Sequence, residues 1–496
     1  MVRAEGEVKM MKLKTTQLAM HGGPKAFPER TGKPQPKIGV DEFMAVAERF
    51  GFNAAALKRI RAAVSNDDLA GNGYGPHLGR YYGSARPPMG ERFEAVAREK
   101  FGVKFAQAAS SGSGALHCAM VAAGAGPGRE VICPAIGFVA TSMAAAITGA
   151  RPVFCDVDES LQLDPAKLEA CITPRTVAVV PTHHWGFVCD MDPIMAVARR
   201  RGIKVIEDCA QAPGAEYMGR RVGSIGDLGC FSISSYKIIG GGEGGMVVTN
   251  DRSLAERALQ LGEAGGLWRP DRFAPERYAG ELFPGTNYRL SELESAIDVV
   301  QLRKLDDVVA RHRKVFRRVR GRLGNYKGIR WQKSNDPDGD IGYMLRFFPR
   351  THELGGKIAE ALQAEGIGCS FRGAEAPPDW HVYRHMLPLF RDYADPCRPE
   401  CCPVGADLYD RNIMVWLDQW YSPEDCDAIA AGINKVLRAL CGKKYRKAKK
   451  IGGTVDPLHR SVRHRGARLP GGLQAHCGRA SQAPDAGDVL HRRQNA

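Results

Sequence analysis

The sequence has no long apolar run. Charged residues interrupt its first twenty positions, MVRAEGEVKMMKLKTTQLAM, and no uninterrupted apolar stretch elsewhere is long enough to cross a bilayer. These absences argue against a signal peptide and a membrane span. We therefore expect a soluble protein that has no membrane partner and works in the cytoplasm.

The sequence also has no cysteine pattern typical of a disulfide framework or a zinc finger. Its 14 cysteines are scattered, mostly within apolar segments, which fits reduced and buried thiols. Cys397, Cys401 and Cys402 form the one cluster, and no second pair follows at zinc-ligand spacing. We predict no metal site.

Acidic residues are too few to balance the basic ones, but the imbalance is local. The chain has a net charge of +15, and residues 443–496, with 13 Lys and Arg against 3 Asp, carry +10 of it. This tail is rich in Gly, Arg and His and poor in apolar residues, which predicts disorder. It has no interleaved aromatics or fold of its own, so we do not expect specific nucleic-acid binding.

Composition is otherwise that of a globular protein, with 44% hydrophobic and 25% charged residues. Apolar strands at 130–133, 152–156 and 177–181 alternate with helical patterns at 165–170 and 193–201. This βαβ rhythm predicts a mainly parallel sheet covered on both faces. Residues 41–66 are expected to form one helix, and a smaller α+β unit is expected after about residue 311.

Lys237 is the most informative residue. In LGCFSISSYKIIGGG, residues 228–242, it is the one side chain expected to be charged at neutral pH, and a glycine run follows it. Close backbone approach would limit its hydration, and desolvation favours the neutral amine. A neutral lysine amine is the nucleophile that forms Schiff bases with carbonyl compounds. The alternative is an ordinary surface lysine.

Asp208 lies toward the polar end of IKVIEDCAQ, residues 203–211, which is typical of a short buried parallel strand. Ligands of open α/β sheets lie at such strand ends. A carboxylate there can keep a pyridinium nitrogen protonated, which makes the ring an electron sink. Glu207 could serve instead, and a helix cap or a loop carboxylate is the structural alternative for Asp208.

A loop of small residues opens an apolar helix at ASSGSG, residues 109–114. Free backbone N–H groups, the helix dipole and nearby hydroxyls suit a phosphate dianion, so Gly112 and Ser113 are candidate ligands. Such loops are often only turns and caps. Together, however, an anion loop, an acid and a lysine in this order predict a pyridoxal 5'-phosphate (PLP) site.

At this point the chain resembles the DegT/DnrJ/StrS family of PLP-dependent sugar and cyclitol aminotransferases. The resemblance covers roughly residues 20–440 and keeps the family's order of motifs. The matching segments are SSGSGALHCAM, VICPAIGFVATSMA, PVFCDVD, PTHHWGFVCDMDPI, VIEDCAQAPGAEYMGRRVGSIGDLGCFSISSYK, GEGGMVVTND, NYRLSELESAIDVVQLRKLD and CPVGADLYDRNIMVWLDQWYSPEDCDAI.

The resemblance implies an α/β fold of the aspartate aminotransferase type, fold type I, with a large mainly parallel-sheet domain and a smaller C-terminal α+β domain. We therefore expect an N-terminal arm at 1–40, a large PLP-binding domain at 41–300, a small domain at 301–442 and the basic tail at 443–496. Ser291 to Glu294 form a capping box, and we expect them to start a long amphipathic helix with Leu293, Ile297, Val300 and Leu305 near one face.

The resemblance also assigns roles to cofactor-binding residues. Lys237 is the catalytic lysine that holds PLP, and Asp208 is the partner of the ring nitrogen. The other implied contacts are Gln211 beside the ring, Phe138 stacked on it, Ser232 with Gly112 and Ser113 at the phosphate, and Asn287, which in the family reaches the phosphate of the neighbouring subunit. Asn287 thus implies a homodimer with shared active sites. Taken alone, Phe138 suits a core position and Asn287 an ordinary loop.

Four residues are candidate substrate contacts. His183 and His184 follow the strand at 177–181, Tyr74 lies in a loop rich in glycine and tyrosine, and His381 lies in DWHVYRH, a segment rich in groups that can bind a polyol. Each has a structural alternative, such as a loop histidine bonded to backbone.

The family implies ping-pong transamination, with pyridoxamine phosphate as the intermediate form of the cofactor. The donor is glutamate or glutamine, and the acceptor is a keto cyclitol, as EDCAQAPGAEY suggests, or a nucleotide-linked keto sugar. Such reactions belong to the biosynthesis of amino sugars and aminocyclitols for antibiotics or polysaccharides. Two alternatives are a sugar dehydratase, in which relatives carry histidine in place of Lys237, and a non-catalytic sensing or scaffold protein. Immediately before Lys237 the chain departs from the family pattern, because Ser234-Ser235-Tyr236 replaces the histidine-proline type of sequence that is common there.

Overall fold

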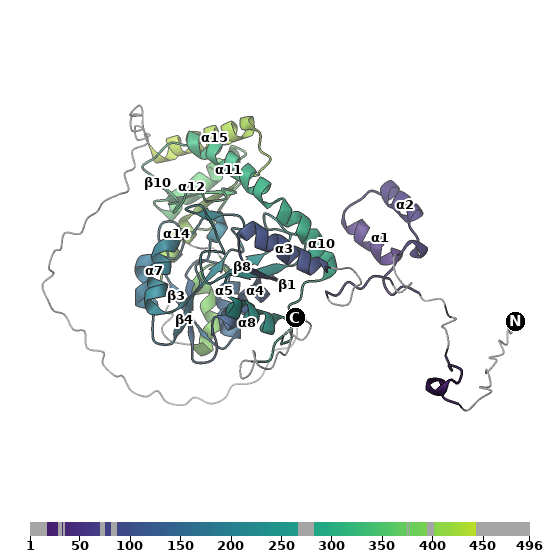
Figure 1. The fold of residues 1–496 in the computed structure, drawn as a ribbon. Helices are drawn as coiled ribbons and strands as arrows, with labels where there is room; N and C mark the ends of the chain where they lie inside the picture. Colours follow the sequence, from purple (N-terminus) through teal and green to yellow (C-terminus); the bar gives the residue numbers. More distant parts are fainter. Residues whose placement is uncertain are drawn as a thin grey trace, which may run out of the picture. The chain divides into compact units, whose positions relative to one another are not determined.

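A computed structural model describes residues 17–27, 32, 35–69, 75–80, 87–265, 282–373, 375, 377–393 and 401–442 (Figure 1). The predicted basic tail lies outside the described residues, and so does Tyr74. Each helix within the described ranges is too short or too polar to cross a lipid bilayer.

A seven-stranded sheet forms the centre of the fold, in the order β1-β9-β8-β5-β4-β2-β3. β9 is antiparallel to both of its neighbours, and the other strands run in one direction. The strands are β1 (Phe105–Ala109), β2 (Glu130–Pro134), β3 (Arg151–Cys155), β4 (Thr176–Val179), β5 (Lys204–Asp208), β8 (Leu228–Ser232) and β9 (Gly245–Thr249). The predicted parallel sheet is therefore confirmed, and the strand predictions are correct to within about two residues.

The strands of this sheet are buried on both sides, because helices cover both of its faces. Along β5, Val205 belongs to one apolar core and Ile206 to the other. The first core packs against α3 (Met89–Phe101), α7 (Met191–Arg201), α10 (Glu292–Arg303) and the start of α11 (Leu305–Arg322). The second packs against α4 (Gly112–Ala122), α5 (Ala140–Ile147) and α8 (Arg252–Gly262). α3 and α10 lie side by side in Figure 1.

A second sheet is antiparallel throughout, in the order β10-β11-β13-β12. Its strands are β10 (Ile329–Trp331), β11 (Met344–Pro349), β12 (Cys369–Phe371) and β13 (Ile413–Trp416). One face packs on α11, α12 (His352–Ala364) and α15 (Pro423–Cys441) in a third core. Ser422 caps α15, with Pro423 at the first turn. The other face carries Met344 and Phe348, which join the cores of the first sheet.

Shorter elements complete the described chain. They are α1 (Val40–Arg49), α2 (Ala54–Ala63), α6 (Pro165–Leu168), α13 (Tyr383–Met386), α14 (Pro403–Arg411), the two-residue strands β6 (Glu216–Tyr217) and β7 (Arg220–Arg221), and the 3-10 helices η1 (Ala19–His21), η2 (Asn66–Asp68), η3 (Glu169–Cys171), η4 (His184–Gly186) and η5 (Leu387–Tyr393).

Two helix predictions were wrong in detail. The single helix expected at 41–66 is two helices, because Gly51 has φ +78° and Asn53 caps a new helix by accepting a hydrogen bond from the Ala56 N–H. The helix after Ser291 ends at Arg303, and α11 begins at Leu305. Leu293 and Val300 are exposed, whereas the buried positions of α10 are Glu292, Ser295, Asp298, Val299 and Leu302.

Candidate active site

The C-terminal ends of β5 and β8 bring Asp208 and Lys237 together. Asp208 is the last residue of β5, and Lys237 follows β8 by one turn, held by a hydrogen bond from its own N–H to the Ser234 carbonyl. Both side chains line the same cavity of about 90 Å³, which also reaches the N-terminus of α4. This is the arrangement expected for ligands of open α/β sheets.

The Lys237 amine is buried enough to change its acidity. Burial lowers the pKa of Lys237 from its ordinary value of 10.5, and the Asp208 carboxylate partly offsets this by raising it. The Lys237 Nζ lies 5.0 Å from the centroid of the Tyr236 ring, which gives it an aromatic wall in place of water. A larger neutral fraction makes this amine a better nucleophile and proton acceptor.

The Asp208 side chain is held in place from two sides. One carboxylate oxygen, Oδ2, accepts a hydrogen bond of 2.6 Å from Thr141 Oγ1, and Oδ1 accepts one of 3.1 Å from the Ala210 N–H. Glu207, the competing candidate, points away: its Oε1 accepts from the backbone N–H groups of Ile225 and Gly226. The geometry therefore favours Asp208. Sequence reasoning missed Thr141, which nothing in its apolar helix distinguishes.

The predicted anion loop forms one wall of the small cavity. Ser111 caps α4 by accepting a hydrogen bond from the Gly114 N–H, and Gly112, Ser113 and Ser232 line the same space. A Cβ on Gly112 would lie 2.7 Å from Ser232 Cβ, so only glycine allows α4 to approach β8 this closely. Thr182 also lines this cavity, and its Oγ1 is buried without a partner within the described part of the chain.

A second cavity of about 660 Å³ adjoins the first, because both are lined by Phe138, Gln211 and Lys237. Phe138 is 43% exposed, which excludes the core position that its residue type suggested. Gln211 Oε1 accepts a hydrogen bond of 2.8 Å from the Trp185 N–H. The wall opposite Lys237 comes from the second sheet and the segments around it, through Tyr343, His381, Trp416, Asp418, Gln419 and Tyr421.

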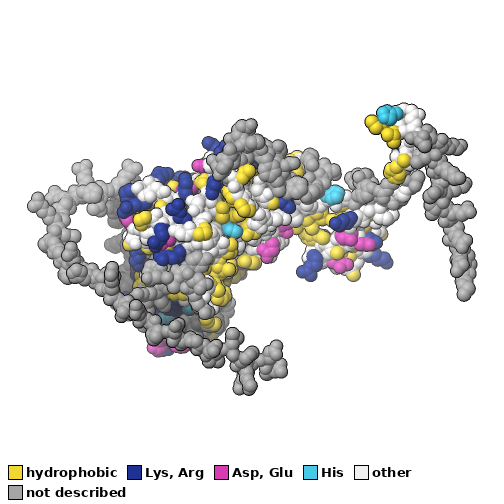
Figure 2. Space-filling model, turned by 90° about the horizontal axis from the view of Figure 1, so that it is seen from below, with side chains coloured by type: hydrophobic (Ala, Val, Ile, Leu, Met, Phe, Trp, Pro, Cys, Tyr) yellow, Lys and Arg dark blue, Asp and Glu magenta, His cyan; other side chains and the backbone are white. Residues whose placement is uncertain are grey.

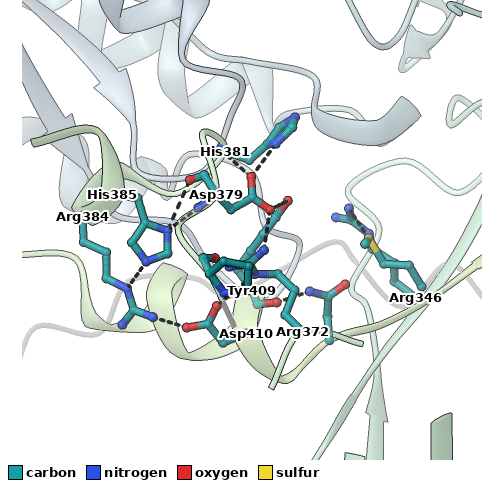
Figure 3. Close-up of polar contacts among 11 residues, drawn as sticks. Arg346, Arg372, Asp379, His381, Arg384, His385, Tyr409 and Asp410 are labelled. Carbon is teal, nitrogen blue, oxygen red and sulfur yellow. Dashed lines mark hydrogen bonds and ion pairs between the residues drawn. The ribbon is translucent and has the colours of Figure 1, made fainter. Parts of the chain in front are cut away.

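His381 reaches this larger cavity on a polar network (Figure 3). Its Nδ1 lies 2.8 Å from Asp379 Oδ1, and its ring lies 5.4 Å from that of Phe138. Arg372 Nη1 donates to Asp379 Oδ2 at 2.8 Å, and Arg372 also pairs with Asp410. Although burial would raise the pKa of Asp379, hydrogen bonds from His381 and the Arg372 charge lower it to about 2. Asp379 is therefore a fixed anion that orients His381.

The other predicted residues lie elsewhere. Both nitrogens of His183 are engaged, since Nε2 lies 3.0 Å from Glu207 Oε2 and Nδ1 accepts from the Cys189 N–H. His183 is completely buried and lines neither cavity, so we leave it out of the substrate site. His184 is also completely buried and outside both linings. Asn287 is exposed and lines neither cavity of its own chain.

Comparison with known proteins identifies the family. The model of the DegT/DnrJ/EryC1/StrS aminotransferase family matches residues 85–434. The chain belongs to this family. It is 45% identical over 350 residues to a GDP-perosamine synthase of Caulobacter vibrioides, covering 70% of this chain and 89% of that protein. It is 44% identical over 358 residues to an L-glutamine:2-deoxy-scyllo-inosose aminotransferase of Streptoalloteichus tenebrarius, covering 68% and 83%.

Solved structures agree with this assignment. An aminotransferase from Psychrobacter cryohalolentis superimposes with a TM-score of 0.61 at 28% identity, covering 71% of this chain and 92% of that one. A 3-amino-5-hydroxybenzoic acid synthase gives a TM-score of 0.62 at 27% identity, covering 73% and 93%. The fold is thus that of the PLP-dependent aminotransferases, and the enzyme is a PLP-dependent aminotransferase, as predicted.

The residues on the cavity fit this cofactor. Lys237 supplies an amine with a lowered pKa, Asp208 a fixed carboxylate for the ring nitrogen, and Phe138 an exposed ring to stack on it. The unpartnered Thr182 hydroxyl and the close approach at Gly112 mark the polar, narrow end of the site.

Proposed function

We propose that this aminotransferase moves an amino group from glutamate or glutamine to the keto carbon of a polyhydroxylated ring. The acceptor is an inosose-like cyclitol or a nucleotide-linked keto sugar, and the product serves amino-sugar or aminocyclitol biosynthesis for an antibiotic or a polysaccharide. The names of the two relatives at 45% and 44% identity support both acceptor classes. The same names, together with Lys237, favour transamination over the dehydratase alternative.

The single observation that carries the proposal is the half-buried Lys237 amine, with a lowered pKa, in the lining of one cavity together with Asp208. When bound, PLP supplies an electrophilic carbonyl and an electron-accepting ring. Lys237 takes the proton from the donor's α-carbon and, in the second half of the reaction, delivers a proton to the former keto carbon. Asp208 keeps the ring nitrogen protonated, and Gly112, Ser113 and Ser232 hold the phosphate.

The larger cavity suits an uncharged polyol. Trp185, Tyr343, Trp416 and Tyr421 give it aromatic surfaces for the apolar faces of a sugar or cyclitol ring, and His381 and Gln419 offer polar contacts to its hydroxyls. Within the described residues, Lys237 is the one lysine or arginine in the lining. A nucleotide diphosphate would find no cation besides that lysine here, so this lining favours a keto cyclitol.

The enzyme is proposed to act as a homodimer with shared active sites. Leu293 and Val300 leave an apolar face of α10 uncovered, and exposed hydrophobic side chains interrupt the charged surface drawn in Figure 2. Asn287, five residues before the start of α10, is exposed and lines neither cavity of its own chain, which is consistent with a residue that serves a partner. Mixing inactive Lys237→Ala chains with inactive Asn287→Ala chains should restore some activity. No recovery in proven heterodimers would refute shared sites.

A cytoplasmic location is part of the proposal. The cysteines described by the structure are free thiols, and most of them are buried. Thiols in this state suit a reducing compartment. Fractionation of the producing cells, followed with an antibody against the chain, would test the location directly.

The central experiment measures the cofactor and the acceptor together. Purified protein should be yellow, borohydride should attach the cofactor permanently to Lys237, and Lys237→Ala should lose transamination. The intact enzyme with glutamine or glutamate is then offered keto cyclitols and nucleotide-linked keto sugars, and amine products are followed by mass spectrometry. A colourless protein that binds a sugar would instead support the scaffold alternative.

A further inference from the structure

His312 is a buried histidine in the wall of the larger cavity. It lies on the apolar face of α11, among Val308, Val309 and Val315, and it is 7% exposed. Its Nδ1 is buried and has no hydrogen-bond partner within the described residues. Most buried polar atoms of folded proteins are hydrogen-bonded, so an unpartnered nitrogen in the lining of a cavity points to a group that enters that cavity.

The surroundings of His312 determine which ring nitrogen carries the proton. The ring makes a hydrogen bond to the backbone carbonyl of Leu417. A carbonyl only accepts, so a ring N–H must donate to it, and since Nδ1 is unpartnered the donor is Nε2. Burial lowers the pKa of His312 below its ordinary value of 6.5, although the Leu417 carbonyl and the Asp418 charge act to raise it. The ring is therefore neutral at neutral pH, and Nδ1 presents a lone pair.

The neighbouring polar side chains do not supply the donor that this lone pair needs. The Tyr343 ring lies edge-on to the imidazole, with 5.9 Å between the ring centroids, but its hydroxyl donates to the Gln211 carbonyl at 2.9 Å. Arg311 donates through Nε to Gln419 Oε1 at 2.9 Å, and its guanidinium lies over the Trp420 ring. The donor must therefore come from the cavity itself, as a water molecule or as a group of the substrate. A substrate that displaces the water without offering a donor loses a hydrogen bond.

The charges in this part of the cavity disfavour an anionic group. Asp418 is the one Asp or Glu in the lining within the described residues. A carboxylate or phosphate beside His312 would meet both a lone pair and a negative charge, and each of them repels it. A hydroxyl carries no charge and can donate to the lone pair.

Gln419 lines the same cavity and offers the complementary group. Because Arg311 can only donate, the Gln419 atom that faces it must be the amide oxygen, which leaves the amide N–H groups of Gln419 as donors. His312 thus offers an acceptor and Gln419 offers donors. Two neighbouring hydroxyls fit this pair, since one of them can donate while the other accepts.

We propose that His312 Nδ1 accepts a hydrogen bond from a ring hydroxyl of the keto acceptor, and that Gln419 donates to the hydroxyl beside it. This inference rests on the proposed function and names the part of the acceptor that the enzyme recognises. A keto cyclitol such as scyllo-inosose carries a hydroxyl on every carbon other than the keto carbon, so it presents such pairs. The carboxylates of the amino-acid donor can only accept hydrogen bonds, and they match neither His312 nor Asp418.

The test separates the two half-reactions. His312→Phe removes Nδ1 but keeps a flat ring against Tyr343, and His312→Asn supplies an amide oxygen that can take the place of Nδ1. His352→Phe is the matched control, because Nδ1 of His352 is also buried without a partner in the described structure but lines neither cavity. Enzyme loaded with pyridoxamine phosphate is mixed with scyllo-inosose, and the return of the yellow colour is followed in a single turnover. PLP-loaded enzyme is mixed separately with glutamine or glutamate.

We expect His312→Phe to slow the acceptor half-reaction about 5- to 20-fold at low acceptor concentration, as loss of one buried neutral hydrogen bond implies. His312→Asn should recover part of this loss, and His352→Phe should match the wild type. The donor half-reaction should stay within about twofold for every variant. Equal loss in both half-reactions, or loss with glutamine alone, would overturn the assignment, since the latter would mean that His312 recognises the donor's amide.

Inososes that each lack one hydroxyl identify the contact. In the wild type, one of them should react more slowly than scyllo-inosose by about the factor that His312→Phe costs. In His312→Phe the same analogue and scyllo-inosose should react at rates within about twofold of each other, because the hydrogen bond is already lost. Losses that multiply for every analogue would contradict a direct contact.

A binding measurement needs no turnover. The unreactive polyol myo-inositol is titrated into enzyme loaded with pyridoxamine phosphate, and the heat of binding is measured. We expect binding that His312→Phe weakens at least about fivefold and that His352→Phe leaves unchanged. Unchanged binding in His312→Phe, or no binding to the wild type, would refute the proposal even if transamination is observed. Binding that depends on His312, without amination of any acceptor, would support the hydroxyl site and refute the proposed function instead.

Discussion

The contact between α4 and β8 gives a sharp prediction about Gly112. A methyl group at this position would lie 2.7 Å from Ser232 Cβ and 3.2 Å from Ser232 Cα. Real Cβ atoms do not approach other atoms so closely, so the N-terminus of α4 must move away from β8. Overpacking of this kind costs about 1–3 kcal/mol, whereas alanine is otherwise a better helix residue than glycine by about 1 kcal/mol.

Gly112→Ala should therefore destabilise the protein and weaken the cofactor site. We expect a loss of up to about 2 kcal/mol in the free energy of unfolding after the helix-propensity gain is subtracted. If the same strain acts on the cofactor site, the affinity of the apo-protein for PLP should fall by up to about 30-fold, because 1.4 kcal/mol corresponds to a factor of ten. Denaturant unfolding of the apo-protein and titration with PLP, followed by absorbance, measure the two effects.

A second substitution distinguishes the clash from other causes. Ser232→Gly removes the atom that the new methyl group meets, at a cost of about 0.5–1 kcal/mol for a glycine in a strand. The double variant should lose less unfolding free energy than the two single variants added together, by at least about 1 kcal/mol. Gly126→Ala is the control, since a Cβ there meets nothing within 4 Å. Wild-type PLP affinity in Gly112→Ala, or strict additivity in the double variant, would refute the reasoning.

Three further predictions concern ionisable groups. The rate of Lys237 acetylation in the apo-protein, measured by peptide mass spectrometry at a series of pH values, should increase with a midpoint below 10.5, the ordinary pKa of lysine. Asp208→Asn should move this midpoint to lower pH, because the Asp208 carboxylate raises the Lys237 pKa. Asp379→Asn should lower kcat/KM for the keto acceptor about tenfold through a misoriented His381, with the donor half-reaction unchanged. Burial and then the charge of Glu294 raise the pKa of Asp298 to about 8, so the wild-type protein should lose stability as the pH rises from about 4 to 8. Asp298→Asn should therefore stabilise the protein more at pH 8 than at pH 5. We expect the gain in unfolding free energy to be about 1–3 kcal/mol larger at pH 8, which thermal unfolding at the two pH values measures.

The sequence predicted the large sheet, and it singled out two residues that the structure brings to one cavity, because both inferences rest on local signals. Strands buried on both faces are continuous apolar runs, and their polar ends bring Asp208 and Lys237 to one edge without any knowledge of packing. The stretch from Ser291 shows the limit of the same reasoning. Its cap was predicted correctly, but the apolar stripe through Leu293 and Val300 is exposed and Asp298 is buried. Periodicity finds an apolar face, but it does not say what covers that face.

The substrate side of the site was harder to predict, because it depends on contacts between segments distant in sequence. Asp379 contacts His381 within one short segment, so DWHVYRH was recognisable as a polar stretch. The contact between Arg346 and Trp185 was not, since within β11 Arg346 is one arginine among apolar residues and Trp185 lies about 160 residues earlier. A strand residue that faces a second sheet is buried whatever its polarity, and its partner is set by the fold. Contacts of this kind cannot be read from local patterns, whereas the strand end and loop that carry Asp208 and Lys237 can.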